Sequence, residues 1–310
     1  MNDFPIDSFE EYLHVIRDEI GIPEGDGKRV RRYFRGQSRL ARGSYVLRPS
    51  IGRYPHLNNL SFYQQRKLEE DVLDTFGNHL LSYVNHLPRN EWESLAIAQH
   101  HGLPTRFMDW TTNPLVALYF ACRETKKDKD NNPMDSAVYV LISEPTRLSD
   151  LKRAPANIIP VKDLETVKAA ATDDPYGETD DPYEDFGIKE GENVEITQDD
   201  ELREGEAQAT NAVPPKDIPT PFEIDENIIY DPPHVSPRIR AQDGVLLACH
   251  QPLLPLEEKD VLELVISHKA HDDIRRRLDQ YGVFDKQLFP DLDGIAKWLK
   301  YRVFEINGMT

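Results

Sequence analysis

The sequence predicts an α+β fold, and three kinds of pattern support this prediction. Apolar runs of strand length occur at 137–142, 245–249 and 261–266, as expected for strands that are buried in a sheet. Longer stretches repeat apolar residues every three to four positions, which is typical of amphipathic helices. Capping boxes mark where two of these helices begin. The 310 residues are enough for one large domain or two modest ones.

The first hundred residues predict three helices and one strand. Capping boxes of Ser8 with Glu11 and of Ser61 with Gln64 begin two helices, and Gly102 closes the third. The strand alternates arginine with apolar and aromatic residues and is expected to end at Gly36. The expected elements are a helix at 9–20 within an N-terminal region 1–28, the strand at 30–35, and helices at 62–85 and 91–101.

Residues 99–121, QHHGLPTRFMDWTTNPLVALYFA, hold the densest group of chemically committed side chains. The Asn-Pro pair at 113–114 predicts a helix start, and an apolar helix follows. The polar residues of 104–112 are therefore expected on a turn at the positive end of that helix, where an anion or a substrate hydroxyl can bind. Alternatively, these residues only satisfy one another, with Asp109 holding Arg106 or a loop amide.

The histidines predict no metal site. His100 and His101 are adjacent and point about 100° apart on a helix, so they cannot share one metal ion. The cluster HKAHDDI at 268–274 lacks a distant partner and is better interpreted as a solvated helix start.

The second half of the chain contains an abrupt change of composition. Residues 172–221 are acidic and lack apolar periodicity, which predicts a mobile insertion; it either is simply solvated or covers a basic site. Order returns at 222–310, the C-terminal part of the same single domain. The expected elements are strands at 137–142, 157–161, 245–249 and 261–266, a helix at 269–281 ended by Gly282, and an amphipathic helix with Leu292, Ile295, Leu299 and Val303 on one face.

The formal net charge of −18 argues against a generally basic surface for duplex DNA. The segment 173–206 has 15 acidic and two basic residues, a net charge of −13, so the rest of the chain carries only −5. A local basic patch at 28–42 is compatible with this distribution.

Cys122 and Cys249 lie in apolar runs without metal spacing, which indicates reduced core thiols. The first residues lack the basic and apolar regions of a signal peptide, and no run of 18 apolar residues occurs. We therefore expect a cytoplasmic protein that does not enter a membrane.

Four motifs resemble the FRG domain, which is named after its Phe-Arg-Gly sequence. They are FRG at 34–36, the stretch at 99–121, PRIRAQDGVLLACH at 237–250 and LFPDLDGIAKWL at 288–299. The resemblance covers about 33–299 in the right order, and the acidic segment is its main departure. This bacterial family often occurs near mobile elements and defence systems, which implies a toxin or a phage-defence effector.

The motif order also resembles the ADP-ribosyltransferase fold, which implies a mixed, mainly antiparallel sheet flanked by helices. In that fold three strands form the site for NAD. The first strand has an Arg or a His, the second has a Ser or a Thr and leads into an apolar helix, and a late strand has a polar residue. The resemblance implies NAD as substrate, no metal, a protein or nucleic-acid acceptor, and an antitoxin or regulatory partner. It assigns chemistry to Arg35, Asp109 and Gln242, where a glutamate is usual at the last position. It assigns contacts with NAD to Arg35, Gly36, Gln37, Thr105, Arg106, Thr111, Thr112 and Tyr119.

Two other functions are open. A nucleic-acid or nucleotide binding module would use the basic stretch 28–42 and stack bases on Trp110. An interaction module would use the central motif for structure only.

Overall fold

The computed structural model describes residues 4–18, 20, 31–80, 82–83, 87–151, 218–232 and 237–305. The strand expected at 157–161 and residues 172–217 of the expected insertion lie outside the described residues, as do Lys28 and Arg29.

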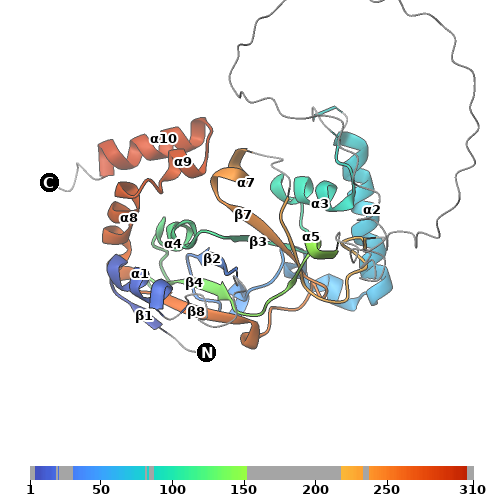
Figure 1. The fold of residues 1–310 in the computed structure, drawn as a ribbon, viewed down its shortest axis with the longest axis horizontal. Helices are drawn as coiled ribbons and strands as arrows, with labels where there is room; N and C mark the ends of the chain where they lie inside the picture. The colour runs from blue at the N-terminus through green and yellow to red at the C-terminus, as the bar shows by residue number, and fades with distance from the viewer. Residues whose placement is uncertain are drawn as a thin grey trace, which may run out of the picture. The chain divides into compact units, whose positions relative to one another are not determined.

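A mixed sheet of eight strands forms the centre of the described part of the chain (Figure 1). The strand order is β1-β8-β4-β2-β3-β7-β6-β5. The pairs β1–β8 and β5–β6 at the two edges are parallel, and the inner pairs are antiparallel. The expected α+β class with a mainly antiparallel sheet is therefore confirmed. The strands are β1 (Phe4–Ile6), β2 (Tyr33–Gln37), β3 (Phe107–Thr111), β4 (Ser136–Leu141), β5 (Thr146–Arg147), β6 (Ile228–Tyr230), β7 (Gly244–Ala248) and β8 (Val261–Ile266).

The sheet is nearly divided in its middle. Strands β2 and β3 share a single residue pair, Phe34 with Thr111, whereas β2 pairs with β4 over five residues and β3 with β7 over five. Beyond Phe34 the two strands separate, and the backbone groups on the two facing edges need other partners.

Helices cover one face of the sheet in two groups. Helices α1, α4 and α8 pack on the half that contains β2, β4 and β8, and α2 and α3 pack on the half that contains β3, β6 and β7. A third apolar cluster covers the opposite face of both halves and is closed by loop residues such as Leu47. The helices are α1 (Phe9–Asp18), α2 (Phe62–Leu80), α3 (Glu91–His100), α4 (Pro114–Cys122), α5 (Leu148–Leu151), α7 (Pro237–Ala241), α8 (His271–Gln280), α9 (Asp285–Leu288) and α10 (Leu292–Lys300).

The predicted caps at Ser8, Ser61, Asn113, Gly102 and Gly282 are confirmed, whereas α2 ends at Leu80, earlier than the expected end at 85. The Ser8 and Ser61 hydroxyls accept hydrogen bonds from the amides of Glu11 and Gln64. Asn113 caps α4 through the amides of Leu115 and Val116. Gly102 and Gly282 have φ angles of 86° and 82° after α3 and α8, which favours glycine at the end of a helix.

Two predictions around the central motif were wrong. Gly36 lies inside β2 and does not end it, because β2 continues along β4 to Gln37. The segment expected as a turn at 104–112 contains β3, which pairs with β7 along its whole length. Because both faces of β3 are covered, its sequence does not show the alternation by which a half-exposed strand is recognised.

The last amphipathic helix was predicted correctly in position, but its apolar stripe is exposed. Leu292 is 82% exposed and Leu299 is 45% exposed in α10, and Val303 beyond it is 51% exposed. No helix among the described residues is long and apolar enough to cross a membrane.

Candidate functional site

A cavity of about 280 Å³ opens where β2 and β3 separate. Residues of β2, β3 and β7 line it, and its other walls come from the end of α3, from α4 and from α7 with the turn that follows. Figure 1 shows these three helices close to β3 and β7. Five residues that the sequence assigned to the site line this cavity: Arg35, Gly36, Asp109, Thr111 and Gln242.

Arg35 connects the two separated strands. Its Nη1 atom donates a hydrogen bond to the backbone carbonyl oxygen of Asp109, so it supplies a donor where the ladder between β2 and β3 is missing. Its Nε atom is buried without a hydrogen-bond partner among the described residues. Burial lowers the pKa of the Arg35 guanidinium, and the Asp109 carboxylate opposes this change. Arg35 was expected at the end of a strand, and it lies in the middle of one.

Asp109 is the only carboxylate among the described residues that line the cavity. Its side chain is exposed, while its neighbours on β3 are buried. The side-chain amide Nε2 of Gln99 lies 3.4 Å from Oδ1 and 3.3 Å from Oδ2 of Asp109. Asp109 was expected to hold Arg106 or a loop amide; its observed partner is instead the Gln99 side chain on α3.

Thr111 and Gln242 connect β3 to the turn before β7. The Thr111 hydroxyl donates to the Gln242 carbonyl oxygen at 2.7 Å and accepts from the amide of Asn113 at 3.0 Å. The Gln242 side chain donates to the Leu288 carbonyl oxygen at 2.9 Å. Gln242 was expected just before a strand, and it lies in the turn between α7 and β7; Asp243 beside it has a φ angle of 46° and is not in an extended strand.

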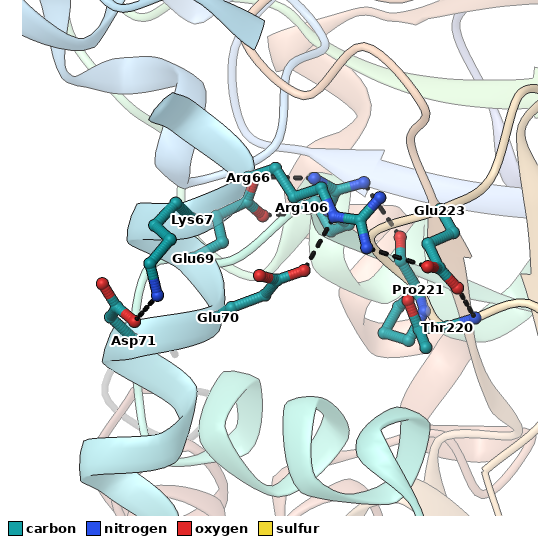
Figure 2. A network of polar contacts seen from close by, with 9 residues as sticks. All are labelled: Arg66, Lys67, Glu69, Glu70, Asp71, Arg106, Thr220, Pro221 and Glu223. Carbon is teal, nitrogen blue, oxygen red and sulfur yellow. Dashed lines mark hydrogen bonds and ion pairs between the residues drawn. The ribbon is translucent and has the colours of Figure 1, made fainter. Parts of the chain in front are cut away.

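Arg106 lies away from the cavity in a buried ion pair (Figure 2). Its Nε and Nη2 atoms donate to the Glu69 carboxylate at 2.9 and 2.6 Å, and Nη1 donates to the Pro221 carbonyl oxygen at 2.9 Å. The side chains of Arg106 and Glu69 are 2% and 4% exposed. Arg106 was expected to contact the ligand, but it lies outside this cavity, and the three donor atoms hold α2 and the segment around Pro221.

Four other predicted contacts also lie outside this cavity. The Thr105 hydroxyl is buried against Gln99, and Gln37 donates to the Tyr45 carbonyl oxygen. Thr112 is exposed, and its amide donates to the Asp243 carbonyl oxygen. Tyr119 lines a separate cavity against the C-terminal helices.

Three polar side chains that the sequence did not assign to the site also line the cavity: Gln99, His100 and Arg238. Burial, then His101 and Arg238, lower the pKa of His100, so His100 is a neutral imidazole at neutral pH. Arg238 is exposed and lies over the Phe289 ring, 4.6 Å from its centroid. The sequence motifs at 99–121 and 237–250 contain all three residues, but their spacing gave no sign that α3 and α7 face each other.

In the part of the chain that the structure describes, no three His, Cys, Asp or Glu side chains gather closely enough to hold a metal ion. Cys122 and Cys249 are buried free thiols, and burial raises the pKa of each to about 12.

Residues 31–130 match the family model of the FRG domain, so the chain carries an FRG domain. The matched region supplies β2 and β3 with the cavity-lining residues of α3 and α4. Comparisons with curated proteins and with solved structures gave no match.

Proposed function

We propose that the protein binds NAD in the cavity between β2 and β3 and transfers ADP-ribose to a macromolecule in the bacterial cytoplasm, as a toxin or defence effector. One observation carries this proposal. Strands β2, β3 and β7 are consecutive neighbours in the sheet. They are the strand with the arginine, the strand that has a threonine and leads into an apolar helix, and the late strand. Arg35 on β2, Thr111 on β3 and Gln242 in the turn before β7 line one cavity although they are far apart in the sequence.

The cavity has groups that suit such a ligand. Its volume of about 280 Å³ is just below the range of about 300–1,000 Å³ that is common for small-molecule sites, so part of a dinucleotide would extend from it. Arg238 at the mouth is a cation that can contact a pyrophosphate. The buried Nε of Arg35 is an unused donor, and an unsatisfied buried donor is a reason to expect an acceptor from a ligand.

The chemistry requires stabilisation of positive charge on a ribose carbon. NAD supplies a glycosidic carbon–nitrogen bond that breaks with its electron pair going to nicotinamide, while an acceptor nucleophile bonds to the carbon and loses its proton. In this proposal the Asp109 carboxylate faces the developing positive charge. Gln242 offers its side-chain oxygen to a ribose hydroxyl, because its amide nitrogen is held by Leu288.

Nucleotide binding without transfer is the second candidate, because Gln242 stands where a glutamate is usual and carries no charge. A nucleic-acid surface is not favoured. Trp110 is among the residues that line the cavity, but it is 3% exposed and packs in the apolar cluster on the opposite face, so its ring is not open to stacking with bases. Within the basic stretch, Arg39 donates to Tyr45 and Arg42 pairs with the buried Glu263 carboxylate.

The test is incubation of the purified protein with adenylate-labelled NAD, with and without bacterial lysate or oligonucleotides, alongside calorimetric titration of NAD. We expect saturable binding and label on a macromolecule. Asp109→Asn should abolish transfer, and Thr112→Ala, at a neighbouring exposed position outside the cavity, should not change it. Binding without transfer would select the second candidate, and the absence of both would reject the proposal.

A further inference from the structure

A chain of hydrogen bonds connects the buried backbone of β3 to Asp109. The Phe107 amide donates to the Thr105 hydroxyl oxygen at 3.1 Å. The Thr105 hydroxyl lies 2.7 Å from Oε1 of Gln99. The Gln99 amide nitrogen then contacts both carboxylate oxygens of Asp109.

The chemistry of these groups fixes the direction of every bond. A backbone amide can only donate, so the Thr105 hydroxyl oxygen accepts from Phe107. The hydroxyl has one hydrogen, and the Gln99 oxygen is the acceptor placed to receive it. The Gln99 side chain is therefore held with its oxygen toward Thr105 and its two N–H groups toward Asp109.

The start of this chain is rigid. Thr105 is 1% exposed, and its backbone is held on both sides by Ser50, whose hydroxyl accepts from the Thr105 amide at 3.0 Å and donates to the Thr105 carbonyl at 3.3 Å. The other end of this chain of hydrogen bonds is different, because Asp109 is exposed to the cavity. A buried threonine thus determines the orientation of an exposed carboxylate.

We propose that Gln99 is a positioning residue that holds the Asp109 carboxylate toward the ligand, with Thr105 setting the orientation of the Gln99 amide. This inference rests on the proposed function for the identity of the ligand. The Gln99 contacts of 3.3 and 3.4 Å lie at the long end of hydrogen bonding. They orient the carboxylate and leave lone pairs on both oxygens, which suits a ligand with hydroxyl donors, such as a ribose.

A ligand-free experiment tests the positioning itself. Nuclear magnetic resonance at neutral pH compares the Gln99 side-chain N–H signals, identified by their loss in Gln99→Ala, between the wild type and Asp109→Asn. We expect the signals to move in Asp109→Asn, because the charged acceptor is lost. Thr105→Val keeps the shape and removes the hydroxyl, so it should reduce this movement when it is combined with Asp109→Asn, and Thr105→Ser should restore it.

A kinetic experiment with NAD tests the consequence for transfer. Gln99→Ala and Thr105→Val should lower kcat by about tenfold to a hundredfold, the scale expected for a misplaced group, with KM within about twofold and Thr105→Ser close to the wild type. Unchanged kcat in both variants, or Gln99 signals that do not move in Asp109→Asn, would overturn the proposal. If the wild-type protein transfers nothing from NAD, the proposed function fails, and the resonance experiment still decides whether Gln99 holds Asp109.

Discussion

Gly36 on β2 and Ala117 on α4 bring their backbones into direct contact. A Cβ atom on Gly36 would lie 1.8 Å from the Ala117 carbonyl oxygen and 2.7 Å from the Ala121 amide nitrogen. These are backbone atoms of a buried helix, which cannot move aside like the end of a flexible side chain. The glycine of the Phe-Arg-Gly motif therefore sets the distance between a strand and a helix that both line the cavity.

Gly36→Ala should destabilise the protein by about 3 kcal/mol or more, because the added methyl group overpacks a helix–strand contact. Urea unfolding measures the change. Gly77→Ala is the matched control, since nothing lies within 4 Å of a Cβ atom at that position on α2, and alanine there should stabilise by about 0.5–1 kcal/mol. A Gly36→Ala protein as stable as the wild type would contradict the observed packing.

Arg106→Met should cost about 3–5 kcal/mol, because it leaves the buried Glu69 carboxylate without its partner. Adding Glu69→Leu should recover most of this loss, since two apolar side chains can replace a buried ion pair. Thermal unfolding of the two variants checks the prediction. NAD titration of the double variant adds a second check, because binding should persist if Arg106 has only this structural contact.

Arg35→Lys should leave the protein folded and abolish transfer. A lysine can still donate one hydrogen bond to the Asp109 carbonyl, but it has no counterpart of the buried Nε or of the planar guanidinium. Circular dichroism and the melting temperature test the fold, and labelled NAD tests the activity. Retained transfer would show that Arg35 only joins β2 to β3. Unfolding would show that the single hydrogen bond from a lysine is not enough to hold these two strands together.

Stability should fall as pH is lowered from 6.5 to 4 because of His271. This imidazole is fully buried between the Thr125 and Ser136 hydroxyls, at 2.9 and 2.8 Å. Burial and then the charge of Arg275 lower its pKa from 6.5 to about 4. Between pH 6.5 and pH 4 the unfolded chain binds a proton that the folded protein does not. The stability that comes from keeping His271 neutral in the folded protein is therefore complete above pH 6.5 and is lost toward pH 4.

The loss is on the order of 3 kcal/mol. Urea unfolding at a series of pH values should show a weaker slope for His271→Gln than for the wild type. His56→Gln, at an exposed position, should keep the wild-type slope. Parallel curves for His271→Gln and the wild type would show that another group causes the pH dependence.

Replacement of residues 172–217 by a Gly/Ser linker should leave the fold intact, because the segment's dense acidic charge and lack of apolar periodicity cannot form a core. Extending the deletion to 221, the boundary expected from the sequence, should destabilise the protein. The carbonyl oxygens of Pro219 and Pro221 accept hydrogen bonds from Trp92 and Arg106. The melting temperatures of the two deletions test this difference, and equal values would contradict it.

Local patterns were sufficient for most of the elements, because caps and periodicity are encoded by neighbouring residues. The α4 start at Asn113-Pro114 and the α3 end at Gly102 are examples. Strand β1 was missed because its three residues are stabilised by parallel pairing with β8, more than 250 positions later. Edge pairing of that kind leaves no periodic signal in so short a segment.

The site was predictable as a set of residues and not as a set of contacts. Five of the residues that were predicted from the motifs line the cavity. Glu69 as the partner of Arg106 could not be foreseen, because the pair joins α2 to the residue just before β3 across 37 positions, and neither residue has a local signature. The partner of Asp109 was ten positions away in Gln99, and only the return of β3 beneath α3 brings them together.

The single pair between Phe34 and Thr111 has a consequence for how the two halves of the sheet are held together. Each half has its own ladder and its own helices on one face, and the apolar cluster on the opposite face contains residues of both halves. At the level of the strands, the Arg35 guanidinium is therefore the main link beside that pair, because it donates to the Asp109 carbonyl oxygen across the cavity. A change at Arg35 affects both the lining of the cavity and the connection between the halves.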